Sequence, residues 1–91
     1  MAVLRAPLDF SRETSPKLWA RVRKGLGDTL RDLAIRRRDT TRVGLLEEAI
    51  AAYKSALEVY TPEAVPTKSV ETRQNLERAE TELQEAKAGA Q

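Results

Sequence analysis

The sequence of 91 residues contains no cysteine and no histidine. The absence of cysteine excludes a disulfide framework, a thiol nucleophile and cysteine-ligated zinc or iron–sulfur sites. The absence of histidine removes the one side chain that titrates near neutral pH unperturbed, and with it histidine-dependent triads and histidine-ligated metals. Carboxylate-only sites need a pocket in which carboxylates converge, and a chain this short has a thin core. The sequence therefore predicts no catalytic residue, metal, cofactor or small-molecule substrate.

Long apolar runs are also absent, so the sequence predicts no membrane-spanning segment. The N-terminus reaches a charge at Arg5, too early for the apolar core of a signal peptide. Charged residues make up 33% of the chain and hydrophobic residues 41%, which is typical of a soluble, helix-rich protein rather than a disordered one. We therefore expect a cytoplasmic protein with one small domain.

Positive and negative charges are distributed unevenly along the chain. The first 45 residues hold 11 basic and 5 acidic residues, whereas residues 46–91 hold 5 basic and 9 acidic residues. A chain with this asymmetry can pair head to tail with itself, or bind an acidic partner through its first half. Solvated helix faces of different sign would give the same distribution.

Apolar periodicity predicts a first helix that begins at Ser15-Pro16 and ends in Arg36-Arg37-Arg38. Serine is a good N-cap, proline fits the first helical position, and basic residues suit a helix C-terminus. The apolar residues at helical spacing are expected to form one buried stripe: Leu18, Trp19, Val22, Leu26, Leu30 and Leu33. Gly25 and Gly27 interrupt this stripe, which suggests that another helix backbone approaches closely there.

A second helix is expected from the break at Asp39-Thr40-Thr41 to about Tyr60. Its stripe alternates steps of three and four residues: Val43, Leu46, Ile50, Tyr53, Leu57 and Tyr60. Small residues beside the stripe permit tight contact between helices: Ala49, Ala52 and Ala56.

Two prolines, Pro62 and Pro66, predict a loop before a third helix, which runs from about Thr67 or Ser69 to Ala88. This helix has the weakest stripe: Val70, Leu76, Ala79, Leu83 and Ala86. A narrow apolar seam on a polar helix is typical of a terminal capping helix.

The expected fold is therefore all-α, an antiparallel helical hairpin with a third capping helix. The expected domain covers residues 16–88, preceded by a flexible lead-in over residues 1–15 and followed by a frayed tail over residues 89–91.

Three stretches carry a resemblance to a known family. Residues 15–20 with Leu26-Gly27-Asp28-Thr29-Leu30 match a first repeat helix, and residues 60–66 match an inter-repeat linker. Within residues 45–57, a small-aromatic-small pattern is formed by Ala49, Tyr53 and Ala56. Over about residues 15–80 the chain thus resembles the tetratricopeptide repeat family, in its long-loop bacterial variety.

The departures from that family are informative. The spacing of 22 residues between Gly27 and Ala49 is about ten longer than usual. In the next repeat, Glu77 stands where a small residue is expected and Glu80 where a large apolar one is expected. The chain thus resembles one full repeat plus a degenerate capping helix.

The resemblance implies a structural role for nine positions: Trp19, Ala20, Leu26, Gly27, Leu30, Ala49, Tyr53, Ala56 and Leu57. About three repeats are normally needed for independent stability, so we expect self-association or docking onto a larger protein. The expected function is a non-catalytic protein–protein interaction module or a small subunit of a larger assembly. Five residues are candidates for partner contact: Trp19, Val22, Leu46, Ile50 and Tyr53.

An alternative function is a small basic adaptor for nucleic acid, which would use the arginine-rich end of the first helix: Arg31, Arg36, Arg37, Arg38 and Arg42. A net charge of +2 and the lack of nearby aromatic residues for base stacking argue against this alternative. The acidic residues of the third helix lack converging partners and predict no metal site: Glu77, Glu80, Glu82 and Glu85.

Overall fold

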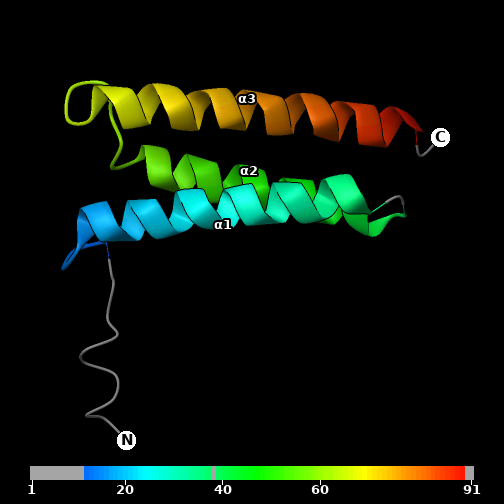
Figure 1. The fold of residues 1–91 in the computed structure, drawn as a ribbon, viewed down its shortest axis with the longest axis horizontal. Coiled ribbons are helices and arrows are strands. Elements are labelled where there is room, and N and C mark those ends of the chain that lie inside the picture. The colour runs from blue at the N-terminus through cyan, green and yellow to red at the C-terminus, as the bar shows by residue number, and fades with distance from the viewer. Residues whose placement is uncertain (1–11, 38, 90–91) are drawn as a thin grey trace, which may run out of the picture.

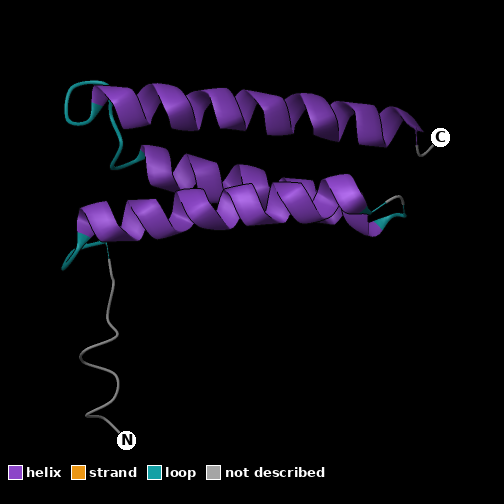
Figure 2. Cartoon of the chain, viewed as in Figure 1, coloured by secondary structure: helices purple, strands orange, loops and turns teal. Residues whose placement is uncertain are grey.

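The computed structural model describes residues 12–37 and 39–89, which form three α-helices and no strand (Figures 1 and 2). These are α1 (Pro16–Arg36), α2 (Thr41–Leu57) and α3 (Pro66–Gly89). Consecutive helices run in opposite directions, and α2 packs on both α1 and α3, which contact each other little. The predicted all-α hairpin with a third helix is confirmed. The expected lead-in up to residue 11, Arg38 and residues 90–91 lie outside the described residues.

A proline and a nearby carboxylate mark the starts of the first two helices. Pro16 occupies the start of α1, and the Ser15 carbonyl accepts a 2.8 Å hydrogen bond from Trp19 N, although the Ser15 side chain makes no capping bond. Before α2, the Asp39 carboxylate accepts hydrogen bonds from Thr41 N at 3.1 Å and from Thr41 Oγ1. These bonds lower the pKa of Asp39 below its ordinary value. The predicted break thus contains a cap that acts from Asp39.

The connection between α2 and α3 is longer than expected, because α2 ends at Leu57 rather than near Tyr60. Tyr60 N still donates to the Ala56 carbonyl at 2.9 Å, so the chain makes one last turn before it leaves the helix. The α3 helix begins at Pro66, as a proline at the first helical position allows.

The buried face of α1 differs from the predicted one. It consists of three small residues spaced seven apart, Ala20, Gly27 and Ala34. Four of the six residues expected in the core are instead exposed: Leu18 (39%), Val22 (51%), Leu26 (40%) and Leu33 (43%). Small residues face α2 because they let it approach closely, and the large apolar residues are then turned outward. The expectation that these four residues, Leu26 among them, belong to a buried stripe is therefore wrong.

Gly27 lies at a point of close approach between α1 and α2. A Cβ atom at this position would lie 2.7 Å from Tyr53 Cε1, so the Tyr53 ring occupies the space that a side chain would need. The group that approaches is a side chain rather than the helix backbone we expected. Gly25 has no such neighbour within 4 Å, so the expectation of close approach is wrong there.

The core lies along α2 in two clusters. One contains Ala49, Tyr53, Leu76 and Ala79, and the other Ala20, Ala56 and Tyr60. The partly buried Leu30 and Leu57 pack against the first cluster and Trp19 against the second. On α3, the predicted core position Val70 is 57% exposed, and the polar residues Ser69 and Thr72 are buried instead. Thr72 is accommodated because its hydroxyl donates to the Lys68 carbonyl at 2.7 Å.

Candidate functional site

A polar network joins the three helices, with Asp28 of α1 at its centre. Asp28 Oδ1 accepts hydrogen bonds from the Tyr53 hydroxyl at 2.5 Å and from Asn75 Nδ2 at 3.2 Å. The other carboxylate oxygen accepts from Lys24 Nζ at 3.4 Å. Burial, reinforced by the bond to Asp28, raises the pKa of Tyr53, so the hydroxyl stays protonated as a donor. The network links α3 to α1, two helices that otherwise contact each other little.

Basic residues of α1 also pair with acidic residues of α3. Arg31 donates two hydrogen bonds to Glu82, at 2.8 and 2.9 Å, and this pairing raises the pKa of the guanidinium. Lys24 Nζ lies 3.5 Å from a Glu71 carboxylate oxygen. Part of the charge asymmetry of the sequence therefore acts within the molecule, because these ion pairs hold the two outer helices together.

The candidate arginine patch is only partly available to a ligand. Arg31 is paired with Glu82, and Arg36 lies 3.3 Å from Asp32 on the exposed side of α1. Arg37 is exposed, Arg42 is partly buried, and Arg38 lies outside the described residues. The structure thus reduces the surface on which the nucleic-acid alternative depends.

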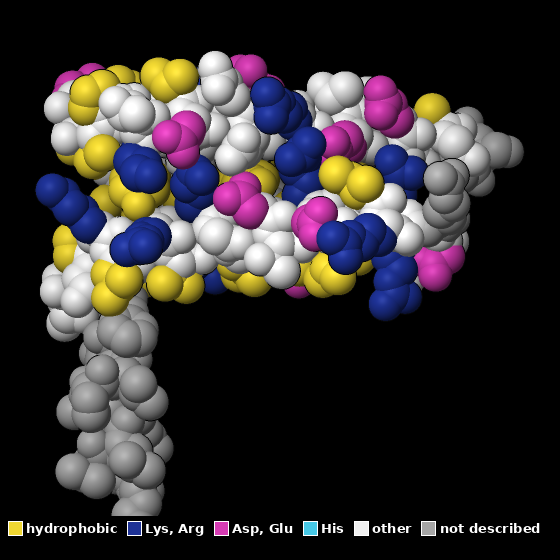
Figure 3. Space-filling model, viewed as in Figure 1, with side chains coloured by type: hydrophobic (Ala, Val, Ile, Leu, Met, Phe, Trp, Pro, Cys, Tyr) yellow, Lys and Arg dark blue, Asp and Glu magenta, His cyan; other side chains and the backbone are white. Residues whose placement is uncertain are grey.

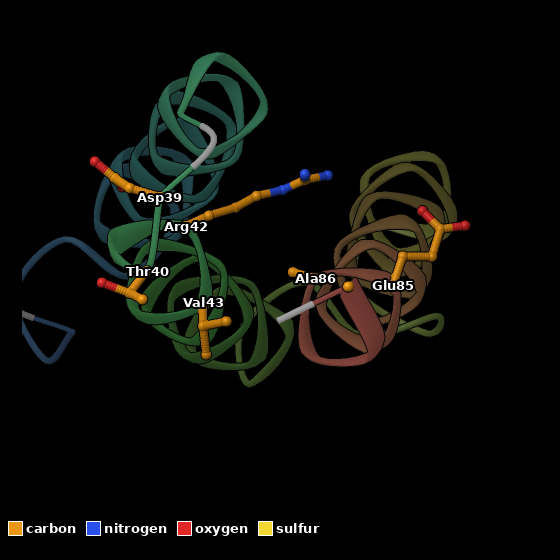
Figure 4. Close-up of a pocket in the computed structure, with 7 residues that line it drawn as sticks. Asp39, Thr40, Arg42, Val43, Glu85 and Ala86 are labelled. Carbon is orange, nitrogen blue, oxygen red and sulfur yellow. The ribbon is translucent and has the colours of Figure 1, made fainter. Parts of the chain in front are cut away.

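A hollow of about 500 Å³ lies between the start of α2 and the end of α3 (Figure 4). The Arg42 side chain extends across it from α2, whereas Glu85 points away from it. Asp39 also borders the hollow, but its carboxylate is already bound to Thr41. The lining supplies one cation and no second group aimed at a common ligand, so we assign no ligand to this hollow.

The clearest surface feature is a row of large apolar side chains on α1, here called the α1 stripe: Leu18, Val22, Leu26 and Leu33. Their spacing places all four on one side of the helix, away from α2. Figure 3 shows apolar side chains along the edge of the molecule that α1 forms, opposite α3. The stripe spans most of the helix length, with the exposed Thr29 between Leu26 and Leu33, so it is a row of several apolar side chains rather than one stray leucine.

The five residues predicted to contact a partner occupy different environments. Val22 belongs to the α1 stripe, and Ile50 is partly buried between α2 and α3. Leu46 and Tyr53 have no exposed surface, which corrects the expectation that they contact a partner directly. Trp19 packs against the core, and its ring lies 5.9 Å from the guanidinium carbon of Arg12 and 5.8 Å from that of Arg23.

Three exposed leucines of α1 were predicted to be buried instead: Leu18, Leu26 and Leu33. The sequence does contain a sign of the true buried side, because three small residues recur every seven positions on the opposite side of the helix: Ala20, Gly27 and Ala34. A row of small residues at that spacing competes with a row of large ones for the helix interface, and in α1 the small residues occupy it.

Within residues 12–37 and 39–89, no group of three or more acidic side chains could hold a metal ion. No helix in the same described segments is long and apolar enough to cross a membrane. No family model, curated protein or solved structure matches this chain. The α1 stripe is therefore the feature from which a function can be inferred.

Proposed function

We propose that this chain is a non-catalytic protein-interaction module, or a small subunit of a larger assembly, that docks through the α1 stripe. The observation that carries the proposal is the exposure of four large apolar side chains, between 39% and 51%, in one row on α1. Exposed apolar side chains gathered on one helix face mark sites of protein contact, because their contact with water is unfavourable.

A tetratricopeptide-like arrangement is part of this proposal. Its support is the packing of small residues between α1 and α2, where Gly27 lies against Tyr53 and Ala20 packs with Ala56. In a stack of such repeats each helix pair buries its free face against a neighbour. The α1 stripe is then the face on which a further helix packs.

Site-specific photo-crosslinking tests whether the stripe contacts another protein. A photoreactive phenylalanine analogue replaces Val22, which is 51% exposed, and the matched control replaces Val70, which is 57% exposed but lies on α3. We expect irradiated cells to give discrete, reproducible adducts from position 22 and none from position 70. No discrete adduct from position 22, or the same products from both positions, would contradict the proposal.

A further inference from the structure

Three of the four α1 stripe residues are placed symmetrically along the helix. Leu26 lies near its centre, with Leu18 eight residues before and Leu33 seven residues after. If two α1 helices pack antiparallel and cross near Leu26, Leu18 of one copy lies opposite Leu33 of the other, and Leu26 lies opposite Leu26. Gly25, beside the centre, has nothing within 4 Å, which leaves room for a second helix to approach.

The charges that border the stripe are self-complementary in this arrangement. Arg21 and Asp32 are both exposed and lie eleven residues apart, which is about three helical turns, so they share one border of the stripe. In an antiparallel pair related by a two-fold axis, the border that carries Arg21 and Asp32 faces the same border of the other copy, which runs in the opposite direction. Arg21 lies five residues before Leu26 and Asp32 six residues after it. Each arginine therefore meets the aspartate of the other copy, whose carboxylate also lies 3.3 Å from Arg36 of its own helix.

The charge pattern also selects between orientations. In a parallel pair, Arg21 would face α1 residues of the second copy at the same height along the helix. Residues 17–25 contain no acidic side chain, so a parallel pair offers Arg21 no carboxylate on α1. Only the antiparallel pair matches both the apolar row and the charges.

We infer that the partner of the α1 stripe is a second copy of this chain, bound antiparallel through α1 in a two-fold symmetric dimer. An isologous interface requires one patch that complements itself, and the stripe with its Arg21 and Asp32 border meets that requirement. The inference rests on the proposed function in that both use the α1 stripe.

Sedimentation equilibrium of the whole chain tests the dimer. We expect a monomer–dimer equilibrium with a dissociation constant of about 1–100 µM, as for a small interface. Val22→Glu should weaken it at least about 30-fold, because it places a carboxylate in the apolar seam. Val70→Glu, the matched control on α3, should leave it unchanged, and both variants should keep the wild-type helix content by circular dichroism. A monomer at all concentrations up to about 1 mM, or a dimer that Val22→Glu does not weaken, overturns the inference.

Charge reversal tests the antiparallel orientation. Arg21→Asp and Asp32→Arg each place like charges opposite one another in a homodimer, and each should weaken it by about 3–30-fold. Mixing the two variants restores both pairs in the heterodimer, which should form with near wild-type affinity at low salt. Single variants that dimerise as tightly as wild type, or a mixture that gains nothing over either variant, overturn the antiparallel arrangement.

The two proposals can fail separately. A crosslinked adduct from position 22 with twice the chain mass supports both the interaction module and the dimer. An adduct with a different protein, together with a monomeric purified chain, keeps the proposed function and overturns the second copy as partner. No adduct at all contradicts the proposed function itself.

Discussion

Substitution of Gly27 by alanine should strain the contact between α1 and α2. The new Cβ atom would lie 2.7, 2.8 and 2.9 Å from three atoms of the Tyr53 ring, all closer than normal packing permits. The ring cannot move aside cheaply, because Tyr53 is fully buried and its hydroxyl is bonded to Asp28. Overpacking of this kind costs about 1–3 kcal/mol, and the better helix propensity of alanine offsets about 1 kcal/mol. The net loss of unfolding free energy should be about 0–2 kcal/mol.

A matched control separates these two effects. Gly44 also lies in a helix and has nothing within 4 Å, so Gly44→Ala should stabilise the protein by about 0.5–1 kcal/mol. Urea unfolding followed by circular dichroism should give Gly27→Ala an unfolding free energy about 1–3 kcal/mol lower than that of Gly44→Ala. In a Tyr53→Leu background, which removes the ring, the penalty at Gly27 should largely disappear. The reasoning is refuted if Gly27→Ala stabilises the protein as much as Gly44→Ala does.

Three further predictions concern the polar contacts. Tyr53→Phe should lower the unfolding free energy by about 1 kcal/mol at pH 7, through loss of the hydrogen bond to Asp28. Because the folded pKa of Tyr53 is raised, wild type should lose stability above about pH 10, where the unfolded tyrosine ionises first, and Tyr53→Phe should lack that component in unfolding curves at increasing pH. The Arg31–Glu82 pair, whose side chains are 24% and 20% exposed, should give a coupling energy of about 1 kcal/mol in a double-mutant cycle, and a zero coupling would contradict the bidentate contact. The lowered pKa of Asp39 means that its carboxylate stabilises the fold above its ordinary pKa near 4, and that this contribution is lost as pH falls through the lowered value. The melting temperature of Asp39→Ala should therefore lie below that of wild type at pH 6, and the difference should shrink at pH 2.

The local features of the fold were predictable from the sequence. Pro16 marks the start of α1 and Asp39 lies at the break before α2, because capping and proline geometry depend on a few adjacent residues. The third helix was expected from Thr67 or Ser69 and begins slightly earlier, at Pro66.

The stripe of α2 was identified in part: Leu46 and Tyr53 are buried, whereas Val43, Ile50 and Leu57 are only partly buried. The other buried residues of α2 are the small ones predicted beside the stripe: Ala49, Ala52 and Ala56. Tyr53, predicted as a repeat position, is fully buried in the core.

The buried face of α1 and the polar network were not predictable in the same way. Large apolar residues and small ones occupy opposite sides of α1, and the choice between them depends on the Tyr53 ring that approaches from α2. The contacts of Asp28 with Asn75 and of Arg31 with Glu82 join residues 47 and 51 positions apart, which no local periodicity indicates. Because the wrong side of α1 was predicted to be buried, three of the four α1 stripe residues were not recognised as candidates for partner contact.

The central claim is that the α1 stripe is a contact surface. Photo-crosslinking from position 22, compared with position 70, measures this most directly, because both positions carry an exposed valine and only one belongs to the stripe. The account predicts a discrete adduct from position 22, at twice the chain mass of 10.2 kDa if the partner is a second copy. Equal yields from the two positions, or no adduct from position 22, would contradict it.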